Sequence, residues 1–169
     1  MRQLIVDCEA SGLQAQSYPI QIAWVDIATR ETDEFYIKPH HTWQHWDYNA
    51  QDIHNIRREE LMHTGLSVSD AARRFLDAVD HGNCRVYSDA PACEGFWLGR
   101  LLLTAGVTPA VAPLEVAHVL DLLPGRPTQS HMAKIMRSQL RPHDALGDCL
   151  MILDAYKQAS NCTQGNTSE

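Results

Sequence analysis

Short apolar runs divide the first forty residues into three expected strands. Residues 4–6 are continuously apolar, which is typical of a central strand buried on both faces. Gly12 interrupts this pattern, and apolar and polar positions then alternate from Ile20 to Asp26. A turn at residues 28–30 and a third strand over 34–38 would complete a hairpin with this segment. The pattern therefore predicts three antiparallel strands at the start of the chain.

Helical spacing first appears after residue 66. Residues 39–60 show little periodicity and suggest a long surface excursion with one short helix. Ser67 is a suitable N-cap with Asp70 three residues on. The apolar positions that follow are spaced as on one helix face: Val68, Ala71, Ala72, Phe75, Leu76 and Val79.

The second half of the chain alternates between the two patterns. Strands are expected over 84–87 and within 116–122, and helices over 94–104, about 129–137 and 142–158. This order predicts an α/β fold with one mixed five-stranded sheet flanked by helices. We expect a single domain over residues 1–158, followed by a polar, disordered C-terminal tail over 159–169.

Composition narrows the class of protein. The chain of 169 residues suits one domain, and no apolar run approaches the roughly 20 residues that span a bilayer. The first apolar stretch is too short for a signal peptide, so a cytoplasmic protein is expected. The five cysteines lack paired spacing, which argues against a disulfide framework or a zinc site. The net charge of −7 argues against coating of long nucleic acid by electrostatics alone, although bound divalent cations would offset part of it.

Two constellations of polar residues carry candidate chemistry. Asp7 and Glu9 follow the first apolar run, and alternation along a strand places both carboxylates on one face. Such paired hard oxygen ligands suit Mg²⁺ or Mn²⁺. His143 and Asp148 lie at the start of the last expected helix, where Asp148 falls among apolar residues and needs a charge partner or a metal. A capping histidine and a surface aspartate are the alternative interpretation of this second pair.

Together the two constellations resemble motifs of the DEDDh group of 3′→5′ exonucleases, which includes polymerase proofreading subunits, oligoribonuclease and ribonuclease T. The first motif, Asp-x-Glu-x-x-Gly-Leu, stands at residues 7–13, and the third, His-x-Ala-x-x-Asp, at residues 143–148. Residues 19–22 are similar to the family's second strand, and 53–56 to its Ile-His-Gly-Ile segment. The resemblance extends over about residues 3–158 and implies a ribonuclease-H-like fold.

The middle motif, within residues 86–98, departs from the family pattern. Where the family has Asp followed four residues later by Leu, this chain has Glu94 and Leu98. Where the family often has Asn a few residues earlier, this chain has Asp89. We expect Glu94 to supply the third carboxylate, directly or through water, with Asp89 as the alternative.

The resemblance implies roles for the remaining site residues. Two divalent ions, Mg²⁺ or Mn²⁺, would be held by four carboxylates: Asp7, Glu9, Glu94 and Asp148. His143 would act as the general base. Gly12 and Leu13 would approach the terminal nucleotide, and His54 would either contact the strand or serve as a structural histidine. Arg137 and Arg141 lie close to His143 in sequence, and we expect them to contact phosphate.

The implied activity is metal-dependent removal of nucleotides from 3′ ends of single-stranded DNA or short RNA, with no membrane partner and with a homodimer allowed by the family. One alternative is a nucleic-acid-binding or partner-binding module on the same fold, weakened catalytically at Glu94. A second is a phosphodiesterase acting on small molecules. The joint presence of Asp7, Glu9, His143 and Asp148 argues against the binding module, because without metal this charge would repel phosphate.

Overall fold

The computed structural model of the protein describes residues 1–79, 83–108 and 114–164. In these residues five strands form one sheet in the order β3-β2-β1-β4-β5. Their bounds are β1 (Arg2–Ala10), β2 (Pro19–Asp26), β3 (Thr32–Tyr36), β4 (Cys84–Ser88) and β5 (Val116–His118). The first three strands are antiparallel, and β4 and β5 run parallel to β1, so the predicted mixed sheet is confirmed.

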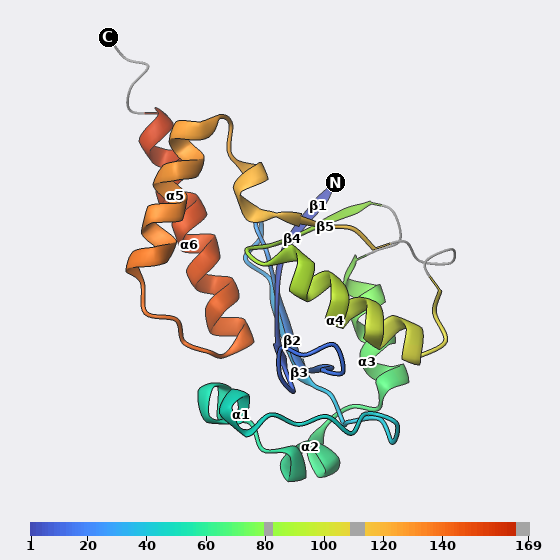
Figure 1. Cartoon of the computed structure of the whole chain (residues 1–169). Coiled ribbons are helices and arrows are strands. Elements are labelled where there is room, and N and C mark those ends of the chain that lie inside the picture. Colours follow the sequence, from blue (N-terminus) through green and yellow to red (C-terminus); the bar gives the residue numbers. More distant parts are fainter. Residues whose placement is uncertain (80–82, 109–113, 165–169) are drawn as a thin grey trace.

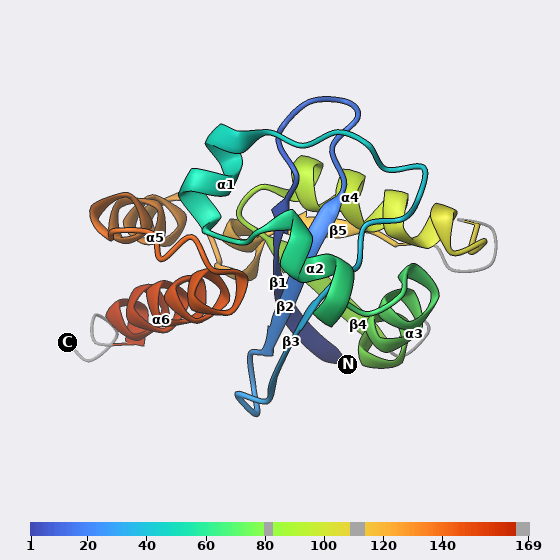
Figure 2. The ribbon, with the colours of Figure 1, turned by 90° about the horizontal axis from the view of Figure 1, so that it is seen from below.

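Helices cover both faces of the sheet (Figures 1 and 2). One face carries α3 (Val68–Val79) and α4 (Pro91–Thr104), and the other carries α5 (Arg126–Ser138) and α6 (Ala145–Gln164). Side chains alternate along β1 and so contribute to the cores on both faces of the sheet. Val6 packs with α3 and α4, whereas Ile5 packs with α6. Asp7 and Glu9 share the face of Ile5 and therefore point toward α6.

Two short helices close one end of the sheet (Figure 2). The excursion expected to hold one short helix contains α1 (Tyr48–His54) and α2 (Arg58–Thr64). The predicted N-cap of α3 is confirmed, because Ser67 Oγ accepts a hydrogen bond from the Asp70 amide at 3.1 Å. The third strand lies two residues earlier than expected, over 32–36, where it pairs with β2.

The C-terminal helix is longer than the sequence pattern indicated. It continues to Gln164, so the expectation of a disordered tail from residue 159 is wrong for 159–164. Ala159 is fully buried in the α5–α6 core, which explains why the helix does not stop at Gln158. Residues 165–169 of the expected tail lie outside the described residues. None of the described helices is long and apolar enough to cross a membrane.

Candidate active site

Three carboxylates from the two ends of the chain meet on the α6 side of the sheet. Asp7 and Glu9 project from β1, and Asp148 lies in the first turn of α6. One oxygen from each lies within 4.8 Å of the other two. Asp7 and Asp148 are only 6% and 2% exposed, so water does little to separate their charges. The predicted pairing of the first and last motifs is thus realised in the fold.

The electrostatics of this cluster favour a bound cation. Burial raises the pKa of Asp7 well above its usual range, and the nearby charges of Glu94 and Asp148 add to this effect. Burial and Asp148 likewise raise the pKa of Glu9 to about 7. Asp148 Oδ1 is buried and has no hydrogen-bond partner among the residues that the structure describes. Close carboxylates with an unpaired buried oxygen are the donor set that a hard divalent cation requires.

Glu94 lies beside the three carboxylates in the first turn of α4. It is 3% exposed, and its Oε2 accepts a hydrogen bond from Ser88 Oγ at 2.7 Å. Ser88 Oγ in turn accepts from the Ala90 amide at 3.0 Å, which fixes the serine rotamer. Burial raises the pKa of Glu94 to about 7, against the lowering effect of the Ser88 hydrogen bond. Ser88 was not singled out from the sequence.

Asp89, the alternative to Glu94, is paired with an arginine and is not part of the three-carboxylate cluster. Its carboxylate is ion-paired with Arg141, in the loop between α5 and α6. Among the carboxylates that raise the pKa of Asp7, Glu94 has the largest effect and Asp89 the smallest. Glu94 therefore fits the position of a fourth ligand better than Asp89 does.

His143 occupies an exposed position two residues before α6 begins at Ala145. Its φ of 55° lies in the left-handed region, which side-chain-bearing residues other than Asn and Asp adopt at a cost of about 1–2 kcal/mol. The next residue, Asp144, accepts a hydrogen bond from the Gly147 amide at 3.0 Å and so caps the first turn of α6. His143 is thus held next to the N-terminus of the helix that contains Asp148.

Gln21 anchors this first turn of α6 and was not recognised from the sequence as a site residue. It is fully buried on β2, opposite Glu9. Its Nε2 donates to Asp144 Oδ1 at 3.1 Å, and its Oε1 accepts from the Ala145 amide at 3.3 Å. A buried glutamine in a strand is unusual, and this was the available sequence signal. Gln21 thereby fixes the start of α6 relative to the strand of Glu9.

Replacing Gln21 by Met is expected to lower kcat about ten-fold, because both anchors of the α6 N-terminus are lost while the side-chain volume is kept. The free energy of unfolding should fall by about 1–3 kcal/mol. Gln3→Met is the matched control, since Gln3 donates to Tyr87 on the neighbouring strand. Steady-state kinetics and thermal unfolding should show a kcat effect for Gln21→Met alone. Equal kcat values for both variants would contradict a positioning role.

The residues expected to contact the terminal nucleotide lie at the turn after β1. A Cβ on Gly12, whose φ is 148°, would stand 2.7 Å from His45 Cε1, so the segment before α1 packs directly on this glycine. Leu13 is 82% exposed and free to meet a ligand. His54 is 8% exposed, and its Nδ1 accepts from the Ile56 amide at 3.0 Å, as in a structural histidine.

The raised pKa values predict how the stability of the metal-free protein varies with pH. The pKa of Glu9 and that of Glu94 rise from the ordinary 4.5 to about 7, so the folded state holds these protons more tightly than the unfolded state does. The contribution of the two groups to the free energy of unfolding is therefore full below about pH 4.5 and is lost as pH rises through 7. In EDTA, Tm should therefore fall between pH 5 and pH 8. Mn²⁺ should reverse the fall and stabilise most at pH 8; a pH-independent metal effect would contradict this.

Comparisons with known proteins agree with this geometry. A family model described as exonuclease, of the RNase T type, matches residues 4–156. Among solved structures, Escherichia coli exonuclease I in a zinc-bound complex with single-stranded DNA superimposes with a TM-score of 0.74 at 16% identity, covering 98% of this chain and 41% of that one. A product-bound structure of exonuclease I gives a TM-score of 0.74 at 15% identity, covering 95% and 43%.

At 15–16% identity the solved structures establish the fold of this chain alone. The chain spans about two fifths of their length. No curated protein sequence matches the chain.

Proposed function

Because the chain belongs to the RNase T family of exonucleases, a DEDD-type family of 3′→5′ enzymes, we propose that it hydrolyses phosphodiester bonds at the 3′ ends of single-stranded DNA or short RNA with the help of two Mg²⁺ or Mn²⁺ ions. The observation that carries this proposal is the convergence of Asp7, Glu9 and Asp148 within 4.8 Å. Residues 1–158, with the rest of α6, would form the single catalytic domain.

The four carboxylates would differ in how they bind the ions. Asp7, Glu9 and Asp148 are the proposed direct ligands, and Glu94 would bind directly or through water from its place against Ser88. When bound, two such ions stabilise the charge of the attacked phosphate and activate the attacking water. The unpaired Oδ1 of Asp148 would gain its missing partner.

His143 is the proposed general base. Its exposed side chain lies just outside the N-terminus of α6, five residues before Asp148, and would take a proton from the attacking water. Gly12 and Leu13 would lie against the terminal nucleotide on the other side of the carboxylates. Single-stranded DNA is the first substrate to test, since the exonuclease I structures are complexes with such oligonucleotides.

The test is degradation of oligonucleotides labelled at either end, as DNA and as RNA, with Mn²⁺, Mg²⁺ or EDTA. Metal-dependent shortening from the 3′ end is expected. An unchanged substrate with both metals would favour the second candidate, a binding module on the same fold. The position of Glu94 outside the three-carboxylate cluster favours that candidate, and Glu94→Asp would then be the variant in which to look for restored turnover.

A further inference from the structure

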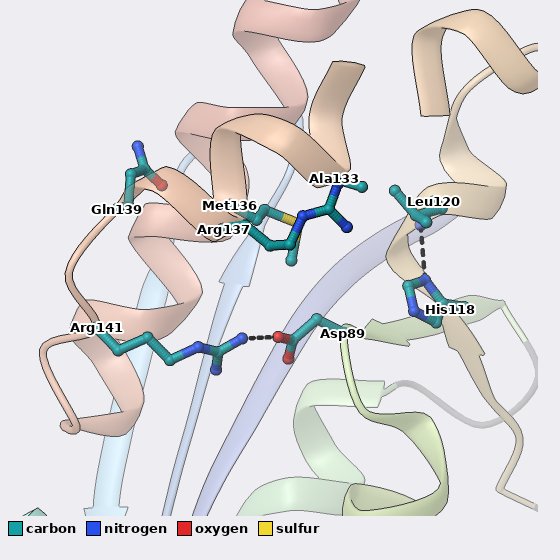
Figure 3. Close-up of a pocket in the computed structure, with 8 residues that line it drawn as sticks. All are labelled: Asp89, His118, Leu120, Ala133, Met136, Arg137, Gln139 and Arg141. Carbon is teal, nitrogen blue, oxygen red and sulfur yellow. Dashed lines mark hydrogen bonds and ion pairs between the residues drawn. The ribbon is translucent and has the colours of Figure 1, made fainter. Parts of the chain in front are cut away.

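A pocket of about 410 Å³ lies on the β5 side of the site, between the turn after β4 and α5 (Figure 3). This volume is within the roughly 300–1,000 Å³ typical of small-molecule sites. Four segments line the pocket: the turn after β4, the end of β5 with the short helix that follows it, α5, and the α5–α6 loop. That loop leads into His143, so the pocket is adjacent to the proposed catalytic residues.

One wall of the pocket is cationic. Arg137 extends from α5 into the pocket, and within the described part of the chain it has no hydrogen-bond or ion-pair partner (Figure 3). Arg141 reaches the pocket from the loop and is paired with Asp89. Two arginines and one aspartate leave one positive charge, which matches the single negative charge of one phosphodiester.

Further polar atoms in the pocket are available to a ligand. His118 Nδ1 accepts a hydrogen bond from the Leu120 amide at 3.1 Å, so a ring hydrogen lies on Nε2, from which it can be donated to a ligand. Gln139 Oε1 is buried and has no hydrogen-bond partner in the described ranges of the chain, so it is an acceptor that a ligand could satisfy. Apolar surface completes the lining, contributed by Leu120, Ala133 and Met136.

We propose that this pocket binds the nucleotide on the 5′ side of the scissile bond, with its phosphodiester at Arg137 and Arg141 and its base or sugar against the apolar wall. A nuclease that cuts the last bond must hold a nucleotide on each side of the cut. The exposed Leu13, proposed above to lie against the terminal nucleotide, is in the turn between β1 and β2 and does not line the pocket. This inference rests on the proposed exonuclease function.

The geometry around Arg141 supports this placement. Its ion-pair partner Asp89 lines the pocket and directly follows Ser88, whose Oγ donates to Glu94, so Arg141 lies close to both the pocket and the carboxylates. A strand passing from the pocket to the carboxylates would therefore remain in contact with Arg141 along its path.

The test compares the affinities of trithymidylate, TpTpT, and thymidine 5′-monophosphate in Ca²⁺, measured by calorimetry on the full chain. Only the trinucleotide can reach from the carboxylates into the pocket. Arg137→Ala should lower the ratio of the two affinities about ten-fold. Lys134→Ala is the matched control, an exposed cation one helical turn away on α5 that does not line the pocket. An equal ratio in both variants and the wild type would overturn the pocket assignment.

A parallel assay separates this outcome from failure of the proposed function. Hydrolysis of the p-nitrophenyl ester of thymidine 5′-monophosphate in Mn²⁺ requires the carboxylates and has no nucleotide on the 5′ side. Turnover of the ester with an unchanged affinity ratio in Arg137→Ala would refute the pocket alone. Absence of turnover with a lowered ratio would refute the nuclease and leave the pocket as a nucleotide site.

Discussion

Replacing Asp7 by Asn should lower kcat at least about 10³-fold and at the same time raise the Tm of the metal-free protein. The loss of activity follows because a neutral amide cannot replace a buried carboxylate in holding divalent cations. The gain in stability follows because Asp7 is buried among Glu9, Glu94 and Asp148, which repel it and raise its pKa. Turnover of a labelled oligonucleotide in Mn²⁺ and thermal unfolding in EDTA measure the two effects.

Asp26→Asn provides the matched control for this prediction. Asp26 is 5% exposed on β2, but amide hydrogen bonds from Thr29 and Ala28 and the side chain of Arg2 lower its pKa in spite of burial. The same substitution there should reduce the free energy of unfolding by about 1–3 kcal/mol and leave kcat close to wild type. If both variants destabilised the metal-free protein equally, the carboxylate cluster would not be under the electrostatic strain described above.

Replacing His143 by Asn should lower kcat by about 10²–10⁴-fold, the usual contribution of a general base, without loss of stability. Asn tolerates the left-handed backbone of this position better than His does, so folding is preserved or improved. Stabilisation by Mn²⁺ should be unchanged, because the proposed ligands remain. Oligonucleotide turnover, metal-dependent thermal shifts and metal-free Tm together distinguish loss of the base from loss of the metal site.

Chemical rescue tests the proposed role of His143 by restoring activity instead of removing it. His143→Gly removes the side chain and suits the positive φ, and added imidazole should restore part of the lost turnover. Turnover of His143→Asn within ten-fold of wild type would refute the role of His143 as base.

The sequence motifs predicted which carboxylates meet where their positions follow from strand alternation or from the start of a helix. Asp7 and Glu9 share a face because strand side chains alternate, and the apolar spacing after Asp148 placed that residue on a buried helix. The mixed sheet could also be predicted from the order of its elements. The exact strand bounds depended on pairing with neighbours, which moved β3 by two residues.

Other parts of the site depend on contacts that local patterns do not encode. Gln21 meets Asp144 across the fold, and Arg141 meets Asp89 in the same way. The pairing of Asp89 with Arg141 is what distinguishes it from Glu94, and no periodicity in the sequence shows it. The extension of α6 to Gln164 reflects burial of Ala159 against α5, a tertiary effect that overrides the polar composition of the segment.

The meeting of β1 with α6 has a consequence for biosynthesis. Asp7 is synthesised well before Asp148, yet the two carboxylates must lie side by side before a cation can bind both. A nascent chain that has completed its sheet and α4 but not α6 would have Asp7, Glu9 and Glu94 in place and would lack Asp148. Metal affinity would then appear in a single step, when α6 docks on the sheet and brings Asp148 to the other carboxylates.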